Sequence, residues 1–380
     1  MTPAGIAMAN RNAHDVPAAP RAVLEQAVEQ HAFPGAAWGV LHNGAVAVVD
    51  SVGRFTYEPR AAAVVPETVF DLASVTKVVA TTAAAMLLAD RGVLDLDARL
   101  GDILPGFVIG MVPGSGKQRV TLRMLLAHSS GMVGWAPLFR NCNTPDALLR
   151  AILRLPLEAQ PGARTEYSDF GFILLGKVIE LLTATPLDVF CAREIFTPVG
   201  LAHTRFCPRL EDRPAIPPTE DDRTFRGRVI QGDVQDEHAF VLGGVAGHAG
   251  TFSNVEDLLR FAQCILDRGR TADETQLFRP ETVDLFATRQ TTPDGQSRAL
   301  GWDVPTEPSS SGRYFGPRSI GHLGYAGTSL WIDPDQNLAI ALLTNRTWPD
   351  RSNEAIRQIR PAFHDAVVES LRAGALGRTV

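Results

Sequence analysis

Apolar and polar residues alternate near both ends of the chain, and a turn interrupts each alternating region. Near the beginning, the segments 37–41 and 45–50 flank His42-Asn43-Gly44. An Asn-Gly pair between alternating segments is a strong hairpin signal, because both residues tolerate the positive φ of a tight turn. Near the end, the segments 329–332 and 338–344 flank the polar turn 333–337 in the same way. The pattern predicts two antiparallel hairpins, one in each terminal region.

Between these regions, apolar residues recur at helical spacing. The longest such segment covers 74–91 and is followed by Gly92, a residue typical of helix C-caps. Further helices are expected at 21–31, 121–127, 145–155, 170–182, 186–196, 255–266 and 353–371. The acidic, proline-containing stretch 211–223 is expected to be an exposed loop.

Strands at both ends with helices between them predict an α+β fold. In the simplest packing, the two terminal regions form one antiparallel sheet flanked by helices, with an inserted all-helical subdomain. We expect residues 1–20 to be a loose tail and residues 21–380 to be a single catalytic domain. Within it, a sheet lobe would comprise 21–73 and 300–380, and a mainly helical lobe 74–299.

Charge narrows the choice of partner. The 380 residues include 36 basic and 42 acidic side chains, which give a net charge of −6 without long runs of one sign. Nucleic acid is therefore not an expected partner, because phosphate binding requires a basic face. Among the basic residues only Lys77, Lys117 and Lys177 are lysines, and the last two are expected at the surface.

The N-terminal residues show neither the basic start nor the apolar stretch of a signal peptide, and no uninterrupted apolar run reaches the ~20 residues of a membrane span. The four cysteines lie far apart and form no C-x-x-C pair, so reduced, mostly buried thiols are expected. A cytoplasmic location without a membrane span is the default; a removed leader would instead place the protein in the periplasm or outside the cell.

Several catalytic signatures are missing from the sequence. Gly114-Ser115-Gly116-Lys117 lacks the spacing and the following Ser or Thr of a phosphate loop, so it is interpreted as a flexible turn. The chain contains no G-x-S-x-G nucleophile elbow, no H-E-x-x-H motif and no cluster of His and carboxylate residues. We therefore expect no metal and no cofactor.

The motif Ser74-Val75-Thr76-Lys77 indicates a serine nucleophile with a lysine base. Residues three apart share a helix face, so the hydroxyl of Ser74 and the amine of Lys77 can meet. A serine needs a neighbouring base to act as a nucleophile at neutral pH, and a buried lysine can supply one where arginine cannot. The alternative is a capping serine followed by a solvent-facing lysine.

Two further elements follow in order, Tyr167-Ser168-Asp169 and then His322-Leu323-Gly324. This order resembles the serine β-lactamase and penicillin-binding protein superfamily. The tyrosine indicates the class C β-lactamase-like branch, which also includes D-alanyl carboxypeptidases, esterases and amide hydrolases. The stretches 120–131, 243–250 and 321–329 are similar to the same branch, and the resemblance extends from about residue 23 to residue 371.

The resemblance implies roles for individual residues. Ser74 would be the acylated nucleophile, Lys77 its proton acceptor and Tyr167 a second general base that also protonates the leaving group. The backbone N–H groups of Ser74 and Tyr325 would form the oxyanion hole. Gly324 would lie beside the substrate.

The chain departs from the β-lactamase pattern at two positions, both expected to contact substrate. Asp169 replaces Asn and only accepts hydrogen bonds when ionised; close to Lys77, it would keep the amine charged and leave more of the base role to Tyr167. His322 replaces a permanently charged Lys, so we expect weaker anion recognition. Both changes favour an ester or a less acidic amide.

Three other residues have open roles. His248, in the glycine-rich run 243–250, is expected to line the cleft. Trp302 is expected to form a wall of the pocket, with core packing as the alternative. His128, beside Ser129-Ser130-Gly131, is expected to be structural.

The sequence thus predicts a metal-free serine hydrolase that acts on a small ester, amide or peptide through an acyl-enzyme on Ser74. Esterase-type activity is favoured. D-alanyl-D-alanine carboxypeptidase or β-lactamase activity is the alternative within the class, and a non-catalytic ligand-binding protein with the same fold is the alternative outside it.

Overall fold

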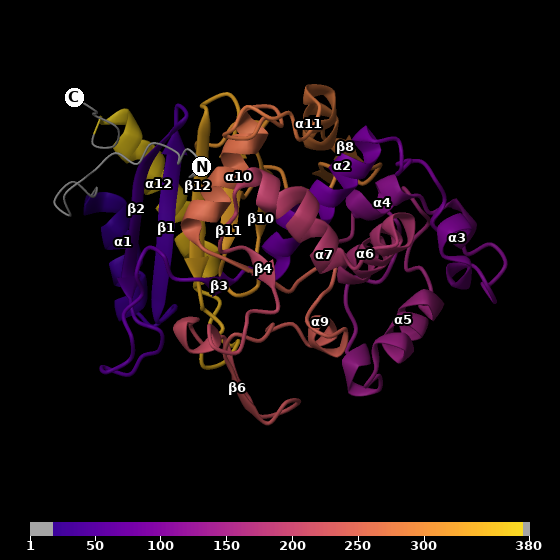
Figure 1. The fold of residues 1–380 in the computed structure, drawn as a ribbon, viewed down its shortest axis with the longest axis horizontal. Coiled ribbons are helices and arrows are strands. Elements are labelled where there is room, and N and C mark those ends of the chain that lie inside the picture. Colours follow the sequence, from indigo (N-terminus) through magenta and orange to yellow (C-terminus); the bar gives the residue numbers. More distant parts are fainter. Residues whose placement is uncertain (1–17, 375–380) are drawn as a thin grey trace.

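A five-stranded antiparallel sheet joins the two ends of the chain (Figure 1). The computed structural model describes residues 18–374. The strand order β10-β11-β12-β1-β2 places the last strand of the chain beside the first, so both predicted hairpins belong to one sheet. These strands are β1 (Gly35–His42), β2 (Ala45–Gly53), β10 (Ile320–Leu323), β11 (Ser329–Asp333) and β12 (Leu338–Thr344).

Alternation along the strands separates two buried cores. On β1, Trp38 and Val40 pack with α1 (Ala18–Glu29) and α12 (Ile356–Arg372) on one face of the sheet. Ala37 and Leu41 point to the other face, where α10 (Val255–Leu266) covers the strands and the large core continues into the helical region. The sheet is therefore enclosed by helices on both faces, as the predicted α+β fold requires.

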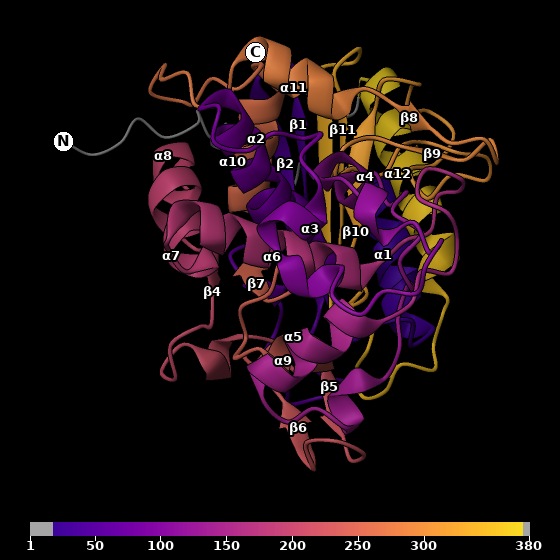
Figure 2. The same cartoon turned by 90° about the vertical axis from the view of Figure 1, so that its right-hand side faces the viewer.

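The middle of the chain is mainly helical and lies to one side of the sheet (Figure 2). Most predicted helices are present, with boundaries that differ by a few residues. The helices of this region are α2 (Ala83–Asp90), α3 (Leu100–Ile103), α4 (Leu122–Leu126), α5 (Pro145–Arg154), α6 (Asp169–Thr183), α7 (Leu187–Cys191), α8 (Thr197–Val199), α9 (Glu237–Val241) and α11 (Pro280–Ala287).

The segment predicted as one regular helix over 74–91 is irregular at its start. A 3₁₀ turn, Ala73–Val75, leads into a π-helical segment, Lys77–Thr82, before α2 begins. By length and composition Ala73–Asp90 could cross a membrane, and so could α6 through α8 as one bent span. However, 83% of Ala73–Asp90 is buried inside the protein, and a core helix passes the same test.

Short strand pairs near the site were not predicted. β3 (Phe70–Asp71), β7 (Thr251–Ser253) and β4 (Arg205–Phe206) form one small sheet beside Ser74. β8 (Gln290–Thr291) pairs with β9 (Ser297–Arg298). The expected loop 211–223 is wrong in part, because β5 (Glu220–Asp222) pairs with β6 (Arg228–Ile230).

The N-terminal tail, Lys117 and the four cysteines were each assigned an environment from the sequence. Most of the predicted tail, 1–20, lies outside the described residues, and its last three residues belong to α1. Lys117 was wrongly expected at the surface: its side chain is buried, and its Nζ donates to the carbonyl of Leu153. The cysteines are unpaired, and three of them are buried while Cys207 is exposed.

Candidate active site

The hydroxyl of Ser74 and the amine of Lys77 meet, as their spacing predicted. Lys77 Nζ lies 3.0 Å from Ser74 Oγ, and the lysine side chain is fully buried. The amine also contacts Asp169 Oδ1 at 2.7 Å and the carbonyl oxygen of His248 at 3.2 Å. A neutral amine can donate to the latter two and accept from Ser74, so this arrangement suits a proton acceptor for the serine.

Asp169 controls the charge of Lys77. Burial by itself lowers the pKa of Lys77, but the Asp169 carboxylate and the nearby Tyr167 outweigh it, so the pKa of Lys77 is raised. The resting site therefore holds an ammonium–carboxylate pair. This charge on Lys77 is the one expected from the sequence when Asp169 lies close to the amine.

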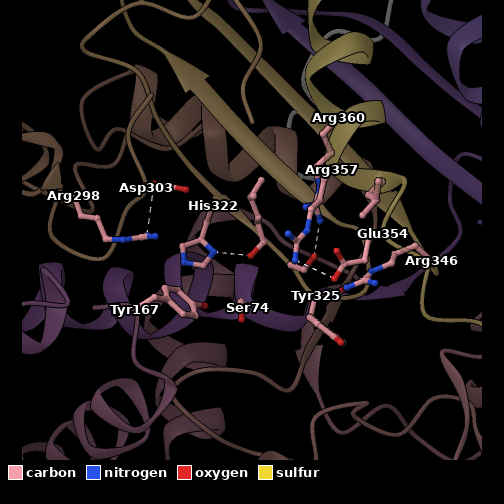
Figure 3. A pocket seen from close by; sticks show the side chains of 13 residues that line it. Ser74, Tyr167, Arg298, Asp303, His322, Tyr325, Arg346, Glu354, Arg357 and Arg360 are labelled. Atoms are coloured by element: carbon pink, nitrogen blue, oxygen red, sulfur yellow. Dashed lines mark hydrogen bonds and ion pairs between the residues drawn. The ribbon is translucent and has the colours of Figure 1, made fainter. Parts of the chain in front are cut away.

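Tyr167 lies beside Ser74, and its hydroxyl points toward the serine (Figure 3). Lys77 Nζ is 4.7 Å from the centre of the Tyr167 ring. Burial raises the pKa of the Tyr167 phenol; Lys77 offsets part of this effect, and Asp169 adds to it. A phenol that is neutral at rest can protonate a leaving group, and it becomes a base once it has given up that proton.

The loop that carries Tyr167 is fixed by its neighbours. His128 Nδ1 accepts the N–H of Ser168 at 3.0 Å, and the His128 ring packs against the Tyr167 ring with 4.6 Å between centres. Ser168 Oγ donates to the carbonyl of Val133 and accepts the N–H of Gly171, which caps α6. His128 is buried, so its structural role is to hold the Tyr167 loop.

The predicted second oxyanion donor lies in a tight turn after β10. The N–H of Tyr325 has no hydrogen-bond acceptor within residues 18–374. Gly324 N donates to the carbonyl of Thr328 at 2.8 Å, and a Cβ at Gly324 would overlap Thr328 Oγ1. Glycine at position 324 thus has a steric cause, and the turn leaves the N–H of Tyr325 available to a substrate oxygen.

Two buried arginines hold this turn without a carboxylate partner among the described residues. Arg346 Nε donates to the carbonyl of Tyr325 at 2.7 Å. Arg360 donates to the carbonyls of Gly324 at 2.6 Å and Thr328 at 2.9 Å. Burial, reinforced by Arg346, lowers the pKa of Arg360 to about 9, and the side chain still carries its charge at neutral pH.

His322 is neutral, as expected. Burial, together with Lys77 and Arg298, lowers its pKa well below the ordinary value. Its Nδ1 contacts the carbonyl of Leu323 at 2.8 Å, while Nε2 has no partner among the described residues and belongs to a side chain that lines the cavity. With Nδ1 as the donor, Nε2 is left as an acceptor for a substrate N–H or O–H.

Ser74, Tyr167, His322, Gly324 and Tyr325 line a cavity of about 270 Å³ (Figure 3). The lining also includes positively charged side chains that the sequence motifs did not reveal. Arg298 lies over the Tyr167 ring, 5.1 Å from its centre, and is 3.6 Å from Asp303. The other charged lining residues missed from the sequence are Arg346, Glu354, Arg357 and Arg360. Four arginines against two carboxylates give the cavity lining a net positive charge.

One local signal was available for Arg298. Thr292-Pro293-Asp294-Gly295 is a typical turn sequence, and it connects β8 with β9, which carries Arg298. The other three arginines follow no motif, since their side chains reach the cavity only through the packing of α12 and the segment after β12.

Three predicted substrate contacts are corrected by the side-chain positions. The Asp169 side chain pairs with Lys77 and does not line the cavity. The His248 side chain is buried and its Nε2 contacts Asp236 Oδ1 at 2.8 Å, so only its carbonyl reaches the site, through Lys77. Trp302 is 1% exposed and stacks near Phe261 in the core. Neither the His248 nor the Trp302 side chain lines the cavity, and core packing, the alternative considered for Trp302, is the correct one.

Within residues 18–374, no group of three or more His, Cys, Asp or Glu side chains is arranged to hold a metal ion.

The Lys77–Asp169 pair gives a testable pH dependence. If Lys77 must lose its proton to accept one from Ser74, the acid limb of the pH–rate profile follows the pKa of Lys77. In Asp169→Asn the loss of the carboxylate is expected to lower that pKa, so the limb should move to lower pH by about 1–3 units. The profile of kcat against pH measures this. The control is Glu180→Gln, which breaks the Lys177–Glu180 pair elsewhere, and an unmoved limb in Asp169→Asn would contradict the coupling.

Comparison with known proteins identifies the family. The family model described as "Beta-lactamase" matches residues 20–362, which is most of the chain. The protein belongs to this family of serine β-lactamases and penicillin-binding proteins, and its fold is the β-lactamase/transpeptidase-like fold.

Two similar proteins are hydrolases by name. The "Putative D-alanyl-D-alanine carboxypeptidase" of Escherichia coli (strain K12) is 37% identical over 306 residues, covering 73% of this chain and 69% of the relative. The "N-acetylmuramyl-L-alanine amidase" of Bacillus subtilis (strain 168) is 34% identical over 351 residues, covering 83% and 77%. Among solved structures, a class C β-lactamase from Rhodobacter sphaeroides has the same fold, with a TM-score of 0.71, 21% identity and coverage of 93% of this chain and 99% of that one. The protein is thus a member of a serine hydrolase family.

Proposed function

We propose that this protein hydrolyses an amide bond in a small peptide-like substrate that carries a carboxylate, through an acyl-enzyme on Ser74. The carrying observation is the contact of Ser74 Oγ with Lys77 Nζ at 3.0 Å, at the edge of a cavity lined by four arginines. The contact supplies the nucleophile and its base, and the arginines supply the recognition of an anion.

The proposed reaction uses only groups in the site. Once Lys77 has lost its proton, Ser74 Oγ attacks the substrate carbonyl carbon and the serine proton passes to the Lys77 amine. The oxygen that becomes negative is held by the N–H groups of Ser74 and Tyr325. Tyr167 then protonates the leaving nitrogen and the C–N bond breaks, which leaves Tyr167 as a phenolate. The phenolate takes a proton from a water molecule, the resulting hydroxide cleaves the Ser74 ester, and the proton held on Lys77 returns to Ser74 Oγ.

The cavity charge shifts the preferred substrate away from the neutral ester favoured by the sequence. That preference rested on Asp169 and on the neutrality of His322, and His322 is indeed neutral. Arg298, however, lies in the same cavity, on the same side as Tyr167 and His322 (Figure 3). A guanidinium binds an anion more strongly than a neutral histidine does, because it is charged and donates several hydrogen bonds. Arg298 therefore takes over the role of the lysine that His322 replaces.

The names of the two relatives support an amide of cell-wall peptide type, since one is named for a D-alanyl-D-alanine bond and the other for an N-acetylmuramyl-L-alanine bond. Ester hydrolysis would follow from the same acyl-enzyme chemistry, with an easier leaving group.

A substrate panel tests the proposal. We expect turnover of D-alanyl-D-alanine peptides or N-acetylmuramyl-L-alanine, a lower kcat/KM when the carboxylate of the same compound is amidated, and an adduct on Ser74 in intact-protein mass spectrometry with a fluorophosphonate. Nitrocefin and neutral p-nitrophenyl esters are the comparison substrates. Faster turnover of neutral esters than of any anionic amide would restore the esterase assignment. A protein that is inert and unlabelled would instead be a binding member of the fold.

Arg298 provides a specific prediction within this panel. Arg298→Gln should raise KM for the anionic substrate by about 10- to 100-fold, because a charge-assisted hydrogen bond contributes about 1.5–3 kcal/mol. KM for a neutral p-nitrophenyl ester should change little. Arg318→Gln, which removes an exposed arginine paired with Asp335 outside the cavity, is the matched control. Equal losses on both substrates would mean that Arg298 does not recognise the anion.

A further inference from the structure

The turn immediately before Ser74 has a backbone conformation that its sequence does not favour. Ala73 has φ of 47°, in the left-handed region where a residue with a Cβ is disfavoured. Its N–H donates to Asp71 Oδ1 at 2.8 Å. The turn therefore depends on a side chain two residues earlier, at the end of β3.

Asp71 is buried, with 1% of its surface exposed, and uses both carboxylate oxygens. Oδ2 accepts the N–H of Gln235 at 2.8 Å. The next residue, Asp236, contacts His248, and the His248 carbonyl contacts Lys77 Nζ. The carboxylate of Asp71 thus joins the turn that presents Ser74 to the segment that supports the Lys77 amine.

The same turn is tied to the oxyanion side of the cavity. The carbonyl of Leu72 accepts the hydroxyl of Thr328 at 2.9 Å. Thr328 closes the turn that exposes the N–H of Tyr325. A shift of the backbone at 71–73 would move Ser74 relative to both its base and its oxyanion donor.

We propose that Asp71 is a positioning residue for Ser74: its carboxylate stabilises the left-handed turn at Ala73 by accepting the N–H groups of Ala73 and Gln235. This inference rests on the proposed role of Ser74 as the nucleophile. Asp71 is not itself placed to contact substrate, because it is buried and is not one of the residues that line the cavity.

The charge of Asp71 makes this positioning sensitive to pH. Burial raises the pKa of Asp71 to about 6; the two N–H donors and Arg226 act in the opposite direction, and Asp236 adds to the rise. Arg226 is itself paired with Asp222, and the facing residues of β7 carry no charge. Protonation turns one acceptor oxygen into a hydroxyl, so one of the two N–H groups loses its partner.

Activity and stability should respond to this proton in opposite directions. The pKa of Asp71 is higher in the folded protein than its ordinary value of 3.8. Its protonation therefore stabilises the fold at low pH, and this contribution is lost as the pH rises through about 6. Acidification from about pH 8 to about pH 5 therefore increases the contribution of Asp71 to the free energy of unfolding. The same protonation weakens the hydrogen bonds that hold the turn before Ser74.

The test measures the rate at which a fluorophosphonate labels Ser74 across this pH range, together with the melting temperature. The protonation of Lys77 slows labelling in every variant, so the rate is expressed as the ratio of the wild-type protein to Asp71→Asn at each pH. We expect this ratio to fall by about 10- to 100-fold toward low pH, with a midpoint near pH 6, because small misplacements of a reacting group cost rates of this size. Asp71→Asn should be slower than the wild-type protein by a similar factor at high pH and should itself lack that midpoint. Relative to Asp71→Asn, the wild-type melting temperature should rise on acidification, which a merely structural role of the hydrogen bonds would not produce.

Asp257→Asn is the matched control. Asp257 is also buried and accepts the N–H of His203 and the hydroxyl of Thr204, outside the cavity lining. This variant should keep the wild-type pH profile of labelling. Should Asp71→Asn fail to fold, Ala73→Gly carries the test: glycine accepts the left-handed φ without help, so the loss of labelling at low pH should shrink by about fivefold or more.

The outcomes separate this inference from the proposed function. A ratio of the wild-type protein to Asp71→Asn without a midpoint near pH 6, or in Ala73→Gly an undiminished loss of labelling at low pH, would overturn the role of Asp71 and leave the hydrolase assignment in place. An absence of labelling in the wild-type protein at every pH would overturn both.

Discussion

Replacing Lys77 with arginine is expected to lower kcat by about 10⁴-fold, although the charge at the position is kept. A guanidinium can still pair with Asp169, but it keeps its proton at neutral pH and cannot act as a base there. Ser74 would then lose the amine that contacts its Oγ and can accept its proton. The substitution therefore isolates proton acceptance from simple electrostatic attraction, and steady-state kinetics on an activated ester measures the loss.

The kcat of Ser74→Ala gives the residual rate for comparison. Removal of the nucleophile and removal of its base should lower kcat by similar factors when the two residues act as a unit. Lys177→Arg is the matched control, because that lysine pairs with Glu180 at an exposed position. A kcat for Lys77→Arg within about tenfold of the wild-type value would leave Tyr167 as the principal base.

The second large effect is expected at Tyr167. Tyr167→Phe removes only the hydroxyl and keeps the ring that packs against His128, so the loop should remain in place. We expect a loss of about 10²- to 10³-fold in kcat, because one group that both gives and takes a proton is removed. If the loss falls on deacylation, acyl-enzyme will accumulate and appear as a burst of product and as a mass increase on Ser74.

Tyr325→Phe is a useful comparison for this variant. The predicted contribution of residue 325 to the oxyanion hole is its backbone N–H, and its half-exposed ring packs against Arg346 rather than against the reacting atoms. This change should therefore leave kcat within about threefold of the wild-type value. A large loss in Tyr325→Phe and a small one in Tyr167→Phe would exchange the roles assigned to the two tyrosines.

What the sequence predicted well was encoded locally. The contact of Ser74 with Lys77 follows from a spacing of three on one helical face, and the hairpins follow from alternation around polar turns. The pairing of β1 with β12 could be proposed because both strands need partners and helices occupy the middle of the chain. The contact of Lys77 with Asp169 could be stated only as a condition, since nothing in the spacing of the two residues fixes their distance.

The remaining features depend on long-range packing. The sequence near His248 does not show that its ring turns toward Asp236 while only its carbonyl faces Lys77. Trp302 follows a glycine-containing stretch that suits a cavity wall as well as a core. Arg346 and Arg360 lack any local signal in the sequence. What distinguishes these two side chains is burial without a carboxylate partner among residues 18–374, and only the folded structure determines that.

The position of β1 between β2 and β12 has a consequence for synthesis of the chain. One edge of β1 pairs with β2, which follows it within a few residues. The other edge pairs with β12, residues 338–344, which are synthesised much later. Pairings of such separation form late and slowly, and they leave an open strand edge in the meantime. His322 and Tyr325 also belong to the last part to be made, so a ribosome-bound chain that already contains Ser74, Lys77 and Tyr167 has no complete site. Hydrolytic activity should therefore appear only after release of the full-length chain.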